Sequence, residues 1–536
     1  QIAALTTTQV GALGATQIAG LTATNVAAMT NTQIGAITAT QIISLTATAV
    51  SGFDSAQFAS LSTTQVKALT TTQMSALDAT DISDFTNTQI AALTTTQIMG
   101  LTTTNVGDLT ETQIGALSTA QVQSLSASSI SNMSDTQIAA FANTQIAALA
   151  SNQVQGLNAT NIGALTTTQV GALTTTQVAL LSTTNVRAMA DTQVAAMSTT
   201  QVRAFTASQI TALRTTDLGE FTETQIGALL DTQVQAFSTT NFAALADTQV
   251  AALKTTQLAA VSTAQVTALT ETQVGALDTT QLQALSTTQL RALTTTNLSA
   301  LDASQMSALT ATQVAGLTTT QISSLDATDV AEFATTQIAA LTTAQVKGLT
   351  ATTVGALLDT QIAAFDATQI ASLSTTNVTG LTETQTAALT ATQVAGLTTT
   401  QLRALTDTNL SHLDATQVAA LTATQIKGLS TAQIGALAAA DVAELTTTQL
   451  SNLLTTQVQA LTATNVASLA GTQVAAFGAT QIGRMTTDAL AALDATQMAA
   501  MTTTQVKGLT STQLTALDAT DIAEFSETQL GALTKD

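Results

Sequence analysis

The apolar and polar residues of the chain repeat every eight positions from one end to the other. The octad is numbered here so that residues 9–13 (QVGAL) fill positions one to five. Position five is apolar in every octad, and position two is apolar in every octad except at Thr386. Position four is usually Ala or Gly, position eight is nearly always Thr, and position one is usually Gln. The 536 residues divide into 67 octads without insertion or deletion, which predicts a single uninterrupted array over residues 1–536.

Positions six, seven, eight and one carry the signal of a helix start. Position six is usually Thr, Ser, Asp or Asn, and position one places Gln three residues later, as in Thr70 and Gln73. In such a capping box the first side chain accepts from the amide three residues on, and the Gln side chain accepts from the amide of the cap. Each octad therefore predicts a cap followed by about six helical residues, for example 71–76.

Two other folds compete with this interpretation. A continuous helix fits poorly, because eight residues at 100° each leave ~80° of drift per repeat and no steady apolar face. A β-solenoid is the stronger alternative, since Thr and Val favour strands. Positions two and five, however, are spaced by three and five residues rather than two, and most glycines fall among the alanines rather than in the Thr run. We predict an all-α solenoid of short N-capped helices, one per octapeptide, with the β-solenoid as the alternative.

Departures from the consensus recur with a longer period. Position one becomes Asn or Asp at Asn25, Asp81, Asn105, Asn161, Asn185, Asp217, Asn241, Asn297, Asp329, Asn377, Asn409, Asp441, Asn465 and Asp521. Nearly all gaps between them are three octads, four octads or sums of these, which averages about 3.4 octads, or ~28 residues. The basic residues at position three, Arg291, Lys347, Arg403, Lys427 and Lys507, fit the same cycle at another phase. The sequence thus predicts a superhelix of about 3.4 octads per turn, with about 19 turns spaced ~10 Å apart and a length on the order of 190 Å.

Composition excludes several classes of protein. Without cysteine there is no disulfide scaffold, thiolate metal site or cysteine nucleophile. A net charge of −21 with 12 basic residues argues against nucleic acid or an anionic membrane as partner. No apolar run approaches the ~20 residues of a membrane helix, so no membrane insertion is expected. The chain begins at Gln1 without a leader and ends on a repeat boundary, from which we expect a piece of a longer protein.

Catalytic side chains are scarce. The one histidine, His412, would need a nucleophile and an orienting carboxylate to act as a base, and Asp414 alone is adjacent. A zinc site would need cysteines or further histidines, which this sequence lacks, and the dispersed glycines form no phosphate-binding loop. Flat threonine arrays can bind ice. Here the position-six Thr is expected to cap helices on a twisting surface, which argues against ice binding. We expect no enzyme, no catalytic residue, no small-molecule substrate and no cofactor, with Ca²⁺ as the single candidate ligand.

Acidic clusters are the candidate site for that Ca²⁺. Residues 77–85 recur almost unchanged at 325–333 and 517–525. The candidate ligands are Asp78, Asp81, Asp84, Asp326, Asp329, Glu332, Asp518, Asp521 and Glu524, and looser copies carry Asp217 with Glu220 and Asp441 with Glu444. Carboxylates at i, i+3 and i+6 supply the hard oxygen ligands that Ca²⁺ takes. In the alternative interpretation, an Asp cap and an Asp in the first turn complement the helix dipole, and the paired acid bonds a hydroxyl or a base on the next turn.

The octads resemble a known type of repeat. The strings at 4–10 (ALTTTQV) and 396–402 (GLTTTQL) are similar to the octapeptide tracts of very large bacterial secreted, adhesin-like surface proteins. This resemblance implies an extracellular location at the bacterial surface and a structural function as a rod, stalk or filament. The alternative function is a solenoid binding module that engages a protein or glycan. Because solenoid ends expose unsatisfied surface, the expected partner is a further copy of the chain, end to end or otherwise.

Overall fold

The computed structural model describes residues 1–533, and this part of the chain is all-helical. It contains a 3-10 helix, η1 (Ile2–Ala4), followed by 66 α-helices of four to six residues, and no strand. The prediction of an all-α fold is confirmed, and the β-solenoid alternative is wrong. The physical reason is local, since each Thr run begins with the helix cap and continues into the helix, as Thr70 to Thr72 do, and so provides no strand pairing.

The helices follow the octads in a strict register. α1 is Thr7–Gly11, α66 is Glu527–Leu530, and each helix begins eight residues after the one before it, at position seven of an octad. Four-residue helices are α6, α25, α51, α59, α60, α63 and α66. Six-residue helices are α5, α7, α8, α10, α11, α14, α15, α18–α22, α26, α28, α32, α35, α36, α38–α40, α43, α44, α46, α49, α50, α52–α54, α57, α62 and α64, and the others have five residues.

Capping explains why each helix begins where it does. In α8 (Thr63–Ala68), the Gln65 amide donates to Ser62 Oγ at 3.3 Å, and the Ser62 amide donates to Gln65 Oε1 at 2.7 Å. The helix ends at Ala68, and the backbone of the C-cap residue Leu69 is no longer helical (φ −57°, ψ 132°). The predicted capping box is therefore confirmed, and such a cap is worth about 1 kcal/mol per helix.

A helix this short is unstable alone, so the octads depend on a shared core. Positions two and five form that core, as shown by Val66 and Leu69, which are 0% and 3% exposed. Burying a Val or Leu side chain contributes roughly 1.5–3 kcal/mol. Phe and Met replace these residues in the same interior positions, for example Phe58 and Met74. The core of each unit is thus a continuous column with two apolar side chains from every octad.

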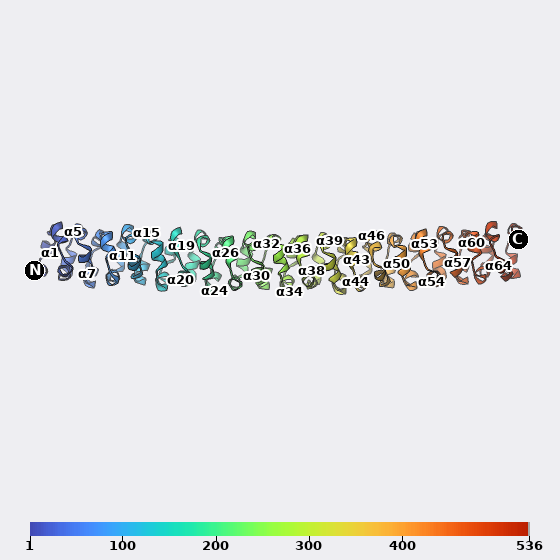
Figure 1. The fold of residues 1–536 in the computed structure, drawn as a ribbon, viewed down its shortest axis with the longest axis horizontal. Coiled ribbons are helices and arrows are strands. Elements are labelled where there is room, and N and C mark those ends of the chain that lie inside the picture. The colour runs from blue at the N-terminus through green and yellow to red at the C-terminus, as the bar shows by residue number, and fades with distance from the viewer. Residues whose placement is uncertain (534–536) are drawn as a thin grey trace. The chain divides into compact units, whose positions relative to one another are not determined.

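The described chain forms two compact units, Gln1–Ala268 and Leu269–Asp536. Within each unit the helices wind around a common axis (Figure 1), and most helices pack on the helix three places further along. α5 (Ala39–Ser44), α8 and α11 (Asn87–Ala92) form one such series. The octad register runs through the sequence from one unit into the next.

Over residues 1–533 no helix has the length and apolar character needed to cross a lipid bilayer.

Candidate functional site

The buried glutamines at position one join successive turns within each unit. Gln65 Nε2 donates to the carbonyl oxygens of Ile34 at 2.8 Å and Ile37 at 2.7 Å, which lie 31 and 28 residues earlier. These carbonyls are at the C-terminal end of α4 (Asn31–Gly35), four helices before α8. We call the position-one glutamines from Gln33 onward the glutamine ladder. Helices three apart pack while side chains reach the helix four back, so the prediction of between three and four octads per turn is confirmed.

The ladder satisfies polar groups that would otherwise be buried without partners. The last carbonyl oxygens of an α-helix accept no hydrogen bond from an N–H group of the same helix, and burying them unpaired costs free energy. Within a unit, a ladder amide such as that of Gln65 uses its oxygen for the cap of its own helix and its nitrogen for carbonyls of the previous turn. One residue type at one position therefore starts a helix and fastens it to its neighbour.

Sequence reasoning assigned this Gln to capping alone and missed the bonds between turns. A usable signal was present. Glu serves a capping box as well as Gln does, yet Glu never occurs at position one in this chain. A carboxylate has no N–H to donate to the carbonyls of the previous turn, and this requirement explains the preference for the amide.

Asparagine at position one keeps part of the same chemistry. Asn185 Nδ2 donates to the Leu157 carbonyl at 2.9 Å, 28 residues earlier, and the backbone N–H of Asn185 donates to Ser182 Oγ. Its shorter side chain forms one bond to the previous turn, and the helix that Ser182 caps has no capping box.

Aspartate at position one cannot donate, and its surroundings differ accordingly. Asp81 is 4% exposed, and its Oδ2 accepts from the Asp78 amide at 3.1 Å and from Ser51 Oγ at 2.9 Å. Asp78 Oδ1 in turn accepts from the amides of Thr80 and Asp81. Burial raises the pKa of Asp81 above its ordinary value, and the charges of Asp78 and Asp84 add to this effect. Asp78 thus caps the helix and Asp81 lies in its first turn. The hydroxyl that bonds this motif belongs to Ser51 of the previous turn and reaches Asp81, whereas the second interpretation placed such a bond between the paired acid and the next turn.

The other two copies repeat the cap. Asp329 accepts from the Asp326 amide at 3.0 Å, and Asp521 accepts from the Asp518 amide at 2.9 Å. Beside them, Glu332 and Glu524 each have one buried carboxylate oxygen without a hydrogen-bond partner in the described part of the chain.

Each position-four glutamate faces further acids. Burial raises the pKa of Glu332, and Asp329, Asp302 and Asp326 raise it further by charge repulsion. Burial likewise raises the pKa of Glu444, next to Asp441 and Asp414. Both Asp302 and Asp414 precede their glutamate by one turn, so the acids of one turn lie over the acids of the next.

Calcium binding by these clusters stays a prediction. The nine candidate ligands fall into three separate clusters, at 78–84, 326–332 and 518–524, in which the cap carboxylates bind backbone amides. Among residues 1–533, no group of three or more His, Cys, Asp or Glu side chains is arranged to hold a metal ion.

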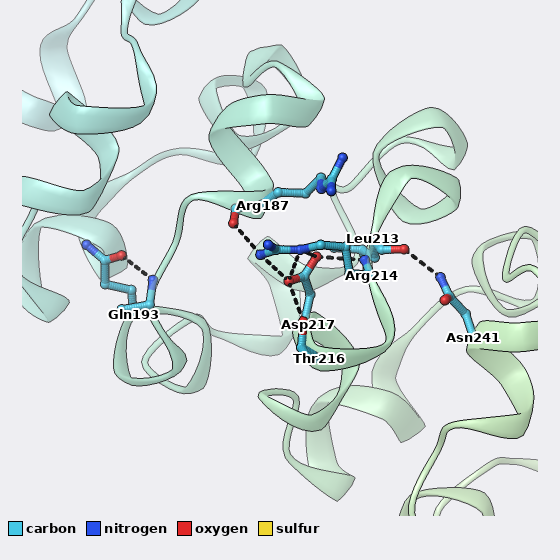
Figure 2. A network of polar contacts seen from close by, with 8 residues as sticks. Arg187, Gln193, Leu213, Arg214, Thr216, Asp217 and Asn241 are labelled. Carbon is cyan, nitrogen blue, oxygen red and sulfur yellow. Dashed lines mark hydrogen bonds and ion pairs between the residues drawn. The ribbon is translucent and has the colours of Figure 1, made fainter.

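Figure 2 shows a different solution at Asp217, in α27 (Thr215–Gly219). Arg214 stands at the cap position, and its Nη2 lies 2.7 Å from Asp217 Oδ1 and donates to the Arg187 carbonyl at 2.9 Å. The guanidinium thus restores the bond to the previous turn that the carboxylate cannot make. Nearby, burial and a hydrogen bond with Asp191 raise the pKa of Glu220 to about 7.

His412 lies at the surface beside a carboxylate. Its Nε2 lies 3.2 Å from Glu383 Oε2, and its Nδ1 is hydrogen-bonded at 2.8 Å to the carbonyl of Thr408, in the helix that ends two residues before His412. The ring joins two turns, as the ladder residues do.

The surface also contains an open groove with two cations. Thr375, Thr399, Thr400, Arg403, Lys427 and Leu454 are among its lining residues, and its volume is about 610 Å³. Leu454 stands at a cap position and is 46% exposed.

These features define an all-helical repeat protein in which each unit is a solenoid of octapeptide repeats. The model of the ALTTAQ repeat family matches residues 146–183, 242–279, 274–311 and 282–319. The chain is therefore similar to ALTTAQ repeats over less than half of its length, and the resemblance to secreted adhesin-like proteins stays a prediction. A search of curated proteins found no match to the chain.

Proposed function

We propose that this chain is a structural repeat protein that builds an extracellular rod, stalk or filament at a bacterial surface. The observation that carries the proposal is the glutamine ladder. The same bonds, such as those from Gln65 to Ile34 and Ile37, fasten turn after turn within each unit. A contact set that repeats without change adds length with every octad, because each repeat contacts only its neighbours along the array.

The location and the partners are part of the same proposal. The extracellular surface follows from the resemblance of the octads to secreted bacterial repeats, and a chain free of cysteine suits export without disulfide chemistry. The net charge of −21 disfavours nucleic acid. We include no catalytic activity and no cofactor, and we expect self-association as the main interaction.

Electron microscopy and small-angle scattering of the purified chain test the proposal. The expected particle is a rod on the order of 190 Å long and about 20–30 Å wide, from turns spaced like packed helices. Deletion of residues 57–112, seven whole octads, should shorten the rod by about 20 Å and leave its width unchanged. A compact particle, or a deletion that changes width instead of length, would contradict the proposal.

A binding module is the second candidate, and the groove with Arg403 and Lys427 favours it. Two exposed cations beside three threonine hydroxyls suit an anionic glycan. Binding of heparin, as a model anionic glycan, that is lost in Arg403→Gln and retained in Arg203→Gln would support this function over a purely structural one.

A further inference from the structure

The 28-residue spacing of the ladder allows charged residues to be placed around the axis of a unit. Gln305 Nε2 donates to the carbonyls of Leu277, 28 residues earlier, and Gly275, 30 residues earlier, so one turn holds about 28 residues and residues 28 apart lie on nearly the same side. The same spacing joins Asn377 to Leu349 and Gln513 to Met485, so the register holds along the unit Leu269–Asp536. The sequence numbers of the charged residues then give their positions around the axis.

The basic residues of this unit lie on one side. Arg291, Lys347 and Arg403 are 56 residues apart, which is two turns, so they fall on one line. Three further basic residues lie near that line: Lys427, Arg484 and Lys507. After whole turns of 28 residues are subtracted, each is offset from the line by at most eight residues, a little more than a quarter of a turn. All six side chains are exposed, and none forms an ion pair within the described residues. We call these six residues the basic side.

The acidic residues of the same unit lie on the opposite side. All of those in the described range except Asp366 and Asp488 fall in the other half of the turn: Glu271, Asp278, Asp302, Asp326, Asp329, Glu332, Asp359, Glu383, Asp407, Asp414, Asp441, Glu444, Asp494, Asp518, Asp521, Glu524 and Glu527. We call these residues the acidic side. The raised pKa values of Glu332 and Glu444 arise from burial and from repulsion within this group. A cation that approaches this side would relieve that repulsion.

We propose that the basic side of this unit docks on the acidic side of a second copy of the chain. This inference rests on the proposed structural function and adds to it a specific lateral contact. The two sides are complementary in charge, and their charged residues also have the same spacing along the axis. Arg291 and Arg403 are 112 residues apart, and so are the acid pairs Asp302 with Asp414, Asp329 with Asp441 and Glu332 with Glu444. Four turns separate the members of every pair, so two copies meet cation to carboxylate at both places.

The geometry also determines what this contact builds. The two sides of a unit face in opposite directions, so one copy uses its basic side and its partner uses its acidic side. Such a heterologous contact leaves a free basic side and a free acidic side at the edges, and the assembly grows by addition of further copies. The expected product is a lateral sheet or bundle.

The test uses the full chain in sedimentation velocity at about 0.01 M and about 1 M salt, where the screening length changes from about 30 Å to about 3 Å. The neutralised variant is Arg291→Gln/Lys347→Gln/Arg403→Gln. Its control is Lys67→Gln/Arg187→Gln/Arg203→Gln, which changes the net charge equally, at position three of the octad, in the other unit.

The wild-type chain and the control should associate at low salt and dissociate at high salt. The neutralised variant should associate about tenfold more weakly at low salt, as three exposed ion pairs imply. Equal weakening of both variants, or a wild-type chain that stays monomeric at low salt, would overturn the docking. Heparin binding by a monomeric wild-type chain would identify the basic side as a polyanion site instead. Rods seen at high salt with no association at low salt would remove this inference and leave the proposed function standing.

Discussion

Gln153 is a suitable position for testing the ladder, because every polar atom of its side chain has a defined role. It is 0% exposed, and its Nε2 donates to the carbonyls of Val122 at 2.7 Å and Leu125 at 2.8 Å. Its Oε1 accepts from the Ala150 amide at 2.8 Å. Ala150 has no hydroxyl, so Gln153 is the side chain that caps α19 (Ser151–Gly156). Gln153→Glu keeps shape and cap but removes both donors.

The expected loss follows from these contacts. Two hydrogen bonds of about 1 kcal/mol each disappear, and a carboxylate is left buried against two carbonyl oxygens, so the total cost is roughly 3–5 kcal/mol. Gln153→Asn should cost about 1 kcal/mol, because the natural Asn185 retains one bond to the previous turn. The loss in Gln153→Glu should shrink at low pH, where the protonated carboxyl regains one donor.

Hydrogen exchange with mass spectrometry is the appropriate assay, since a long repeat array opens locally rather than in one step. Protection should fall in peptides covering residues 119–125 and 150–156. The matched control is Gln155→Glu, an exposed residue of the same helix, whose effect should stay within about 1 kcal/mol. Equal losses at positions 153 and 155 would refute the reasoning, because Gln155 lacks the bonds to the previous turn that Gln153 makes.

Three further predictions concern charge, a buried hydroxyl and close packing. The pKa of Glu220 is raised to about 7 in the folded state, so its contribution to stability is complete below about pH 4.5 and is lost as pH rises through about 7. Melting followed by circular dichroism should therefore occur at lower temperature at pH 8 than at pH 5, with a smaller difference in Glu220→Gln. Thr386 is 0% exposed and its hydroxyl bonds only the Thr382 carbonyl, so Thr386→Val should raise local exchange protection by about 1 kcal/mol; a decrease would contradict this. Gly107→Ala meets no atom within 4 Å and should stabilise by about 0.5–1 kcal/mol, whereas a Cβ at Gly508 would lie 2.8 Å from the Ala479 carbonyl carbon and should cost about 1–3 kcal/mol. Equal hydrogen-exchange protection in Gly107→Ala and Gly508→Ala would show that contact between turns does not limit the replacement of glycine.

Local features were readable from the sequence because their causes lie within one octad. The capping box of Ser62 and Gln65 joins residues three apart, and its pattern predicts both the helix and its start. The two buried positions were also predictable, since an unbroken apolar pattern at positions two and five implies one core column. The acidic caps were predicted as one of two alternatives, and the local hydrogen bonds at Asp78 and Asp81 show this cap, whereas calcium binding stays a prediction.

Contacts between turns were only partly predictable. The recurrence of Asn and Asp indicated a period near 28 residues, because positions one turn apart share an environment. The partners of Gln65 at Ile34 and Ile37 were not predicted, because no local rule states which carbonyls an amide will meet 28 or 31 residues away. The role of Arg214 as a substitute for the ladder amide at Asp217 has the same origin, since it depends on the Arg187 carbonyl of the preceding turn.

The sequence by itself determined the octad, its cap, its helix and its apolar column, since these follow from interactions among neighbouring residues. The tertiary structure decided how one turn is held to the next and which side of a turn each charge occupies. The physical reason is the angle between successive octads. That angle brings an amide onto carbonyls four helices back and separates the carboxylates of the second unit from its cations, and it is set by packing among turns rather than within one.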